Sequence, residues 1–208
     1  MLCLLMAGCT SSTQANAPVR VDAMVTWIER VHVEAERSRQ AVGDAFERLN
    51  ALAAGKFGKE PASTVYARFV QSTDLAEQQA KRFRDVVGPM VAAATPVFAE
   101  RQQSLATIGN ERMRQRSELR YSVDKQRYEA ISKVAVPTQD QLDAFVKSLR
   151  DHAAFLAYDL NGGAIDEIRD EVKLVANEAR DLDHNLESCQ SAARAYVDQL
   201  APPAEPAR

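Results

Sequence analysis

The sequence predicts an all-α protein, an elongated antiparallel coiled-coil helical bundle of four to five long helices. Its composition is that of long helices: 46% of the 208 residues are apolar, only 6% are aromatic, and Gly and Pro number eight each. Apolar residues also recur at alternating steps of three and four over long stretches, which is the a/d pattern of coiled coils. No segment alternates with period two for long, so we expect no β-sheet.

The first helix is predicted to begin near Pro18, because proline suits the first turn of a helix. The apolar seam that follows contains only one polar residue. Its members are Val21, Met24, Ile28, Val31, Ala35, Ser38, Val42, Ala45, Leu49 and Leu52. Gly55, Gly58 and Pro61 then predict a turn. The segment Gly55-Lys56-Phe57-Gly58-Lys59-Glu60 also faintly resembles a phosphate loop, but two residues instead of four separate its glycines, so a turn is favoured.

The second helix has a weaker seam of the same spacing. Its members are Val65, Phe69, Ser72, Ala76, Gln79, Phe83, Val86, Met90, Ala93 and Val97. Pro89 and Pro96 lie inside this run. A proline removes one helical hydrogen bond and kinks or breaks a helix, so we expect a kink or a short break between Val87 and Pro96.

The third segment stays helical from about Val97 to Val134 but loses its clean periodicity. The expected inward residues are Leu105, Ile108, Met113, Leu119, Val123, Tyr128 and Ile131. Gly109-Asn110 is a weak point in this helix. Val136-Pro137-Thr138 predicts a turn, and Thr138 with Gln141 predicts a capping box that opens the next helix.

Two further helices are predicted after this turn. The first runs to about Leu160 and places on one face Leu142, Phe145, Leu149, His152 and Leu156. Asn161-Gly162-Gly163 interrupts or ends it, giving a second kink. The last helix has the cleanest seam, stopped by Pro202: Ile165, Ile168, Val172, Val175, Ala179, Leu182, Leu186, Cys189, Ala193, Tyr196 and Leu200. Short turns between long helices require antiparallel neighbours.

The charge is distributed unevenly although the formal net charge is only -3. Residues 110–139 carry seven Lys or Arg against four Asp or Glu, whereas residues 140–208 carry seven against fourteen. We therefore expect the basic stretch 110–127 to lie against the acidic last third, brought there by the turn at Pro137.

The first residues, MLCLLMAGC, resemble the lipobox of bacterial lipoproteins, in which small residues precede a cysteine that receives the lipid. Cys9 is then the lipidation site and the membrane is a partner. Met6 stands where leucine is commonest. Thr10 is not the Asp that retains such proteins in the inner membrane, which favours the periplasmic side of the outer membrane. The alternative is a chance apolar start with a free Cys9.

These features divide the chain into four parts. Residues 1–8 are a lipoprotein-type signal peptide, predicted to be truncated because no Lys or Arg precedes Cys9 and the apolar stretch is short. Residues 9–17 are a flexible tether, residues 18–201 the bundle domain, and residues 202–208 a disordered tail.

No catalytic, metal or cofactor site is predicted. Glu29 and His32 form an E-x-x-H pair of the kind that holds metal in di-iron bundles, and Asp181 with His184 offers a second pair. Both pairs lie beside or away from the apolar seams, whereas metal ligands must converge inside a bundle. Cys189 occupies a seam position as a small hydrophobe, and His152 is expected to be a packed, hydrogen-bonded residue.

A basic strip is the one candidate binding site. Arg112, Arg114, Arg116 and Arg120 are candidate contacts for an anion or lipid, with Lys125 and Arg127 nearby. Acidic residues interleave with them and few aromatic residues accompany them, so nucleic acid is not expected. The favoured interpretation is that the strip neutralises the acidic helices of its own chain.

The segment Arg150 to Ile165, RDHAAFLAYDLNGGAI, resembles the most distinctive part of an uncharacterised family of bacterial envelope proteins with a single helical domain of unknown function. The matching residues are Arg150, Asp151, Phe155, Leu156, Leu160, Asn161, Ala164 and Ile165. The departures, which include loss of a Lys-His pair, are Ala157, Tyr158, Asp159 and Gly162. RSELRYSVDKQRYEAI, from Arg116 to Ile131, is also similar. The resemblance covers about Val21 to Leu200 and implies an all-helical protein without an assigned activity.

The sequence thus predicts a non-catalytic, lipid-anchored envelope scaffold or binding module, not an enzyme, with no cofactor. Its partner is a second copy of the chain or another envelope protein, because heptad seams can close within one chain or between two. The alternative is a peripheral coiled coil that binds anionic lipid through the strip from Arg112 to Arg127. A helical metalloenzyme is the third hypothesis.

Overall fold

A computed structural model of the chain describes residues 17–158 and 160–199. These residues form five helices and no strand: α1 (Ala17–Ala53), α2 (Ala62–Leu105), α3 (Glu111–Tyr158), the short α4 (Gly162–Glu167) and α5 (Arg169–Asp198). The predicted all-α class is therefore confirmed. The predicted signal peptide, Cys9 and the tail at 202–208 lie outside the described residues. α1 begins at Ala17, one residue before the predicted start.

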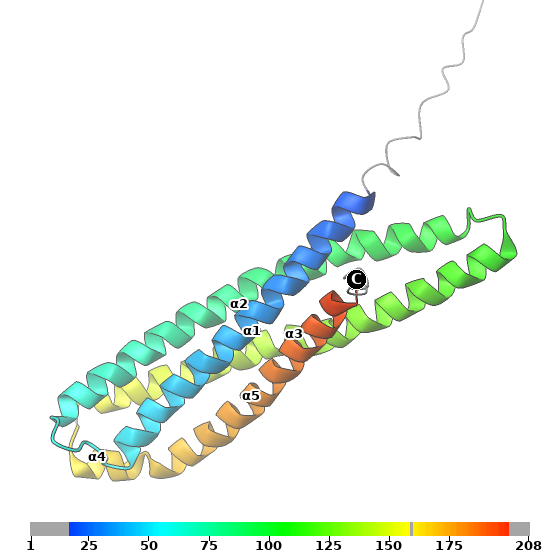
Figure 1. The fold of residues 1–208 in the computed structure, drawn as a ribbon. Coiled ribbons are helices and arrows are strands. Elements are labelled where there is room, and N and C mark those ends of the chain that lie inside the picture. Colours follow the sequence, from blue (N-terminus) through cyan, green and yellow to red (C-terminus); the bar gives the residue numbers. More distant parts are fainter. Residues whose placement is uncertain (1–16, 159, 200–208) are drawn as a thin grey trace, which may run out of the picture.

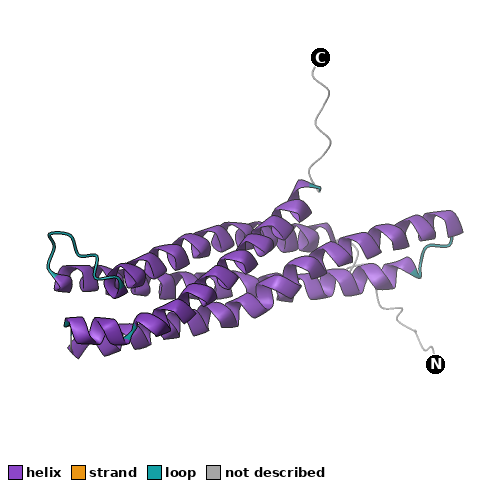
Figure 2. Ribbon diagram, turned by 90° about the horizontal axis from the view of Figure 1, so that it is seen from below, coloured by secondary structure: helices purple, strands orange, loops and turns teal. Residues whose placement is uncertain are grey.

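The four long helices form an elongated antiparallel bundle (Figures 1 and 2). Around the bundle α1 neighbours α2, α2 neighbours α3, α3 neighbours α5, and α5 returns to α1. One continuous apolar core lies between them. No helix of the described residues is both long and apolar enough to cross a membrane.

The predicted seams account for most of this core. Every seam residue predicted in α1 is buried except Val21, which is half-buried, and every described one predicted for the last helix is buried. Ser38 is also fully buried, where its Oγ donates to the Glu34 carbonyl at 2.7 Å. The turn at 55–61 is confirmed, since Gly55 and Gly58 adopt the positive φ values of 63° and 60° that glycine tolerates best.

In α2, Met90 and Val97 are buried as predicted, but the other two seam positions predicted after Phe83 shift by one residue. Val87 and Ala94 are buried where Val86 and Ala93 were predicted. Two successive steps of four, from Gln79 to Phe83 and then to Val87, replace the strict 3/4 alternation. No break occurs at Pro89 or Pro96, and α2 continues as one helix through both.

The turn predicted at Val136-Pro137-Thr138 is wrong. α3 runs unbroken through Pro137, whose side chain is exposed, so the carbonyl that loses its helical bond lies on the solvent side. Thr138 is no cap: it is fully buried, and its Oγ1 donates to the Val134 carbonyl at 2.7 Å. The core seam simply continues across the proline, from Ile131 through Ala135, Thr138 and Leu142.

The second reversal of the chain lies instead at the predicted weak point, Gly109-Asn110. α2 ends at Leu105 and α3 begins at Glu111, which makes α2 and α3 a long hairpin. Asn110 caps α3, because its Oδ1 accepts from the Met113 amide at 3.1 Å. At the other end of the molecule, the predicted interruption at Asn161 is confirmed: its Oδ1 accepts from the Ala164 amide at 3.0 Å and caps α4.

Polar contacts fix the antiparallel register of the helices. Arg39 of α1 donates from Nε to Asp183 of α5 at 2.8 Å. Tyr66 of α2 donates from its hydroxyl to the Ala153 carbonyl of α3 at 2.8 Å. Asn185 of α5 donates to Gln141 of α3. The acidic half of α5 therefore lies beside the second half of α3, and the predicted packing of the basic stretch 110–127 against it is wrong.

Candidate functional site: the α2–α3 arm

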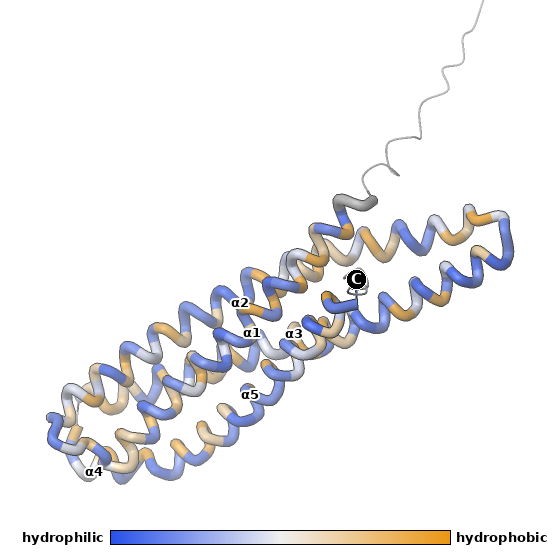
Figure 3. Tube along the Cα trace, viewed as in Figure 1, coloured by the Kyte–Doolittle hydropathy of each residue, from blue (hydrophilic) through white to orange (hydrophobic). Residues whose placement is uncertain are grey.

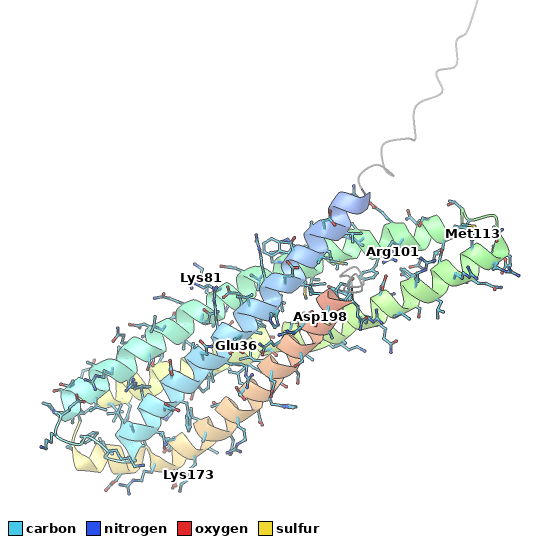
Figure 4. The ribbon with its side chains drawn as sticks, in the orientation of Figure 1. Glu36, Lys81, Arg101, Met113, Lys173 and Asp198 are labelled. Atoms are coloured by element: carbon cyan, nitrogen blue, oxygen red, sulfur yellow. The ribbon has the colours of Figure 1, made fainter. Side chains whose placement is uncertain are left out.

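The end of the α2–α3 hairpin projects beyond the bundle (Figure 1). We call residues 99–130, from Ala99 of α2 to Ala130 of α3, the arm. No residue of the arm is buried, whereas Phe98 before it and Ile131 after it both are. The arm leaves the bundle because α5 ends at Asp198 while α3 continues alongside α2 alone; Figure 4 shows Asp198 well short of Met113 at the tip.

Aromatic and ionic contacts hold the base of the arm. The ring of Phe98 lies 5.3 Å from that of Tyr128 and meets the edge of Tyr121 at 6.2 Å. Arg101 pairs with Asp124 at 2.8 Å, which joins the two helices. These contacts give α2 and α3 a fixed relation although no apolar core continues between them.

The end of α5 packs against this base. Burial raises the pKa of Tyr196 to about 12, and the nearby Asp124 carboxylate adds to that rise. Burial also raises the pKa of Tyr128. Both hydroxyls are therefore neutral at physiological pH, and the base of the arm is a packed aromatic cluster rather than a reactive site.

The basic strip lies on the arm, and its arginines differ in their surroundings. Arg114 is half-buried and pairs with Glu111 and, at 3.8 Å, with Glu118. Arg112, Arg116 and Arg120 are exposed, and no carboxylate of the described residues pairs with them. Figure 3 shows hydrophilic residues dominating this first part of α3.

Two apolar residues predicted to point inward lie on the same exposed surface. Met113 is 61% exposed and Leu119 is 67% exposed. The prediction of burial assumed a bundle around the whole of α3, but only α2 accompanies this part. Arg112, Arg116 and Leu119 recur at steps of four and three and so share one helix face; the side toward α2 carries Tyr121 and Tyr128 instead.

The other sequence candidates do not converge. His32 of α1 places Nδ1 3.1 Å from the Gln190 carbonyl of α5, while Glu29 and His184 are exposed. His152 places Nδ1 2.8 Å from the Ser148 carbonyl, as a packed residue of its own helix. No group of three His, Cys, Asp or Glu side chains is placed to hold a metal ion within the described part of the chain.

Cys189 is fully buried in the core. Burial raises the pKa of its thiol to about 12. A thiolate is the reactive form of cysteine, so this side chain acts as a small apolar residue, as its seam position predicts.

Ion pairs cross the groove between α2 and α3. The groove between α2 and α3 contains Arg84, Asp143 and Arg150. Arg84 pairs with Asp143, and Arg150 pairs with Asp74 at 2.7 Å and with Glu77. These pairs connect the two helices, whereas Arg112, Arg116 and Arg120 of the arm have no carboxylate partner among the described residues.

Comparison with known proteins identifies a family without an assigned activity. Neither the curated proteins nor the solved structures contain a match to this chain. The family described as "Protein of unknown function (DUF2959)" matches residues 16–200, which cover the bundle from α1 to the end of α5. The chain therefore belongs to the DUF2959 family, as its resemblance to an uncharacterised single-domain family predicted.

Proposed function

We propose that this protein is a non-catalytic scaffold or binding module of the bacterial cell envelope, held by lipid on Cys9 at the periplasmic side of the outer membrane. The lipobox-like segment before Cys9 supports the anchor. The arm supports the binding role, because it presents exposed arginines and apolar side chains outside the packed bundle. It is the observation that carries the proposal.

The placement of the arm agrees with such an anchor. α1 begins at the end of the bundle from which the arm projects, and Arg20 near its start pairs with Glu100 at the base of the arm. Ala17 is eight positions after Cys9, a span of at most about 28 Å. A chain anchored at Cys9 would therefore hold the start of α1, and with it the arm, within reach of the bilayer.

Fatty-acid labelling tests the anchor. The protein is expressed from the next upstream in-frame start, and cells are fed a radioactive fatty acid. We expect label on the wild-type chain and none on Cys9→Ser. Absence of label from both would refute the anchor, whereas label on both would place the lipid on another residue.

A second candidate function is binding of anionic lipid by the basic strip. The exposure of Arg112, Arg116 and Arg120 without a carboxylate partner favours it, since phosphate headgroups could take that place. Co-sedimentation with phosphatidylglycerol vesicles tests it. Binding that persists after replacement of Arg112, Arg114 and Arg116 by Ala counts against this candidate, and binding that is lost supports it.

A further inference from the structure

We propose that the arm docks on the α4–α5 end of a second copy of this chain in an antiparallel, two-fold symmetric dimer. The inference does not depend on the lipid anchor. It rests on two exposed faces of opposite charge at opposite ends of the bundle. The basic face consists of Arg112, Arg116, Leu119 and Arg120 of α3. The acidic face consists of Glu167 at the end of α4 and Glu171, Leu174, Glu178 and Asp181 of α5.

The acidic face is a continuous exposed stripe. Its five residues are all exposed, with Leu174 at 64%. The four on α5 recur at steps of three and four, and Glu167 ends α4 four positions before Glu171. None of its four carboxylates has a cationic partner within the described residues. The neighbouring cations have other partners: Arg169 pairs with Asp166 at 2.7 Å, Lys173 pairs with Asp170 at 2.6 Å, and Arg180 donates to the Asn177 side-chain oxygen at 3.1 Å.

The basic face also lacks carboxylate partners, because the nearby acidic residues of the arm pair with other arginines. Glu111 and Glu118 both pair with Arg114, and Asp124 pairs with Arg101. The acids that interleave with the arginines in sequence therefore lie away from this face. Each face thus combines uncompensated charge of one sign with one exposed leucine.

Both faces lie on the same side of the molecule, the side formed by α3 and α5. Asn185 of α5 and Gln141 of α3 meet across that pair of helices at 2.9 Å. Leu174 precedes Asn185 by 11 residues, about three turns, and Leu119 precedes Gln141 by 22 residues, about six turns. Because each spacing is close to a whole number of helical turns, Leu174 lies on the side of α5 that carries Asn185. Leu119 likewise lies on the side of α3 that carries Gln141.

The chain cannot bring its own two faces together, because they lie at opposite ends of a rigid bundle (Figure 1). α3 and α5 run antiparallel within one copy. A two-fold axis perpendicular to the bundle reverses the second copy, so its α5 runs parallel to α3 of the first. The same axis makes the contact occur twice, which is the property of an isologous interface.

The spacing of the two faces matches in this parallel orientation. With Leu119 opposite Leu174 of the second copy, Arg112 stands opposite Glu167 and Arg116 opposite Glu171. Arg112 and Glu167 each precede the leucine of their own helix face by seven residues, and Arg116 and Glu171 each precede it by three. Phe155 of α3, 47% exposed and about four turns beyond Gln141, adds apolar surface beside the acidic face. An apolar centre with charged flanks is the usual composition of a specific interface.

Charge exchange tests the dimer. We would measure sedimentation equilibrium of the full chain carrying Cys9→Ser, of its Arg112→Glu/Arg116→Glu form, of its Glu167→Arg/Glu171→Arg form, and of an equimolar mixture of the two. Lys81→Glu/Arg82→Glu on α2 is the matched control, since both residues are exposed and have no carboxylate partner in the described part of the chain. Circular dichroism checks that each form is helical.

We expect the Cys9→Ser chain and the Lys81→Glu/Arg82→Glu control to form dimers. Each reversed form should dissociate at least about tenfold more readily, because like charges then oppose each other at both contacts. The mixture should recover the dimer, since each of its two contacts again joins opposite charges. A monomer throughout, or no recovery in the mixture, overturns the proposal. The dimer is also refuted if the chain is monomeric and its binding to phosphatidylglycerol vesicles is lost in Arg112→Glu/Arg116→Glu. In that case the basic face binds anionic lipid instead.

Discussion

Asn185 of α5 donates a hydrogen bond from Nδ2 to Oε1 of Gln141 on α3 at 2.9 Å. This contact places the middle of α5 beside a residue only four positions after Pro137. α3 must therefore continue past the proline as a helix, with its second half along the acidic half of α5. The arm is the part of the α2–α3 hairpin that extends beyond the end of α5.

Replacement of Pro137 by Ala tests the continuity of α3. An exposed proline inside a helix removes one hydrogen bond, so Pro137→Ala should raise the free energy of unfolding by about 1–3 kcal/mol. Urea denaturation measures this. Pro61→Ala is the control, because Pro61 lies at the start of α2 with φ -61° and should change stability little. A loss of stability in Pro137→Ala would instead indicate a turn.

Truncation of two leucines of α3 should change the free energy of unfolding by very different amounts. Leu149 is fully buried in the bundle, and Leu149→Ala should lower the free energy of unfolding by about 2–5 kcal/mol. Leu119 lies exposed on the arm, and Leu119→Ala should change it by less than about 0.5 kcal/mol at a protein concentration where the chain is monomeric. Chemical denaturation of both variants compares them. Equal losses would mean that the arm is packed like the bundle.

Stability should fall at alkaline pH because two buried groups resist ionisation. The pKa of Cys189 rises from 9.0 to about 12 and that of Tyr196 from 10.0 to about 12 on folding. A raised folded pKa contributes stability that is fully present below the unfolded pKa and is lost as pH rises toward the folded value. We therefore expect a decline between about pH 9 and pH 12. Urea unfolding at several pH values measures it, and Cys189→Ala should make the decline shallower. An unchanged slope would contradict the assignment to Cys189.

The ion pair between Arg39 and Asp183 should contribute little to stability despite its geometry. Nε donates to Oδ1 at 2.8 Å and a terminal nitrogen donates to Oδ2 at 3.2 Å, and this partnership raises the pKa of Arg39. The Asp183 side chain is 47% exposed, so water screens the pair. A double-mutant cycle with Arg39→Ala and Asp183→Ala should give a coupling of about 0.5–1 kcal/mol that weakens with salt. A coupling that is insensitive to salt would contradict this screening.

The sequence predicted the parts of the fold where one physical signal dominates. The seams of α1 and α5 are regular over many turns, and the glycines at 55 and 58 mark their turn directly. The error at Pro137 came from weighing a local breaker above the seam that continues through it from Ile131 to Leu142. Proline on the solvent side of a packed helix is tolerated, because its cost is smaller than the burial on the opposite side.

The candidate site was predicted only in part. Sequence located the basic strip and its four arginines, but assigned them to the acidic helix of the same chain. Loss of periodicity after Val97 was the available signal that this segment leaves the core. The pairing of Arg114 with Glu111 and Glu118, which leaves Arg112 and Arg116 free, depends on three-dimensional placement that spacing alone does not define.

Site-specific cross-linking tests the docking of the arm on a second copy most directly. Leu119→Cys and Leu174→Cys would be made separately in a chain carrying Cys3→Ser and Cys9→Ser, where the one native thiol that remains, Cys189, is buried. We predict that mild oxidation links the two proteins only when they are mixed, because the two-fold axis holds the two Leu119 positions of a dimer far apart. Linkage of Leu119→Cys to itself, or none in the mixture, would contradict the antiparallel dimer.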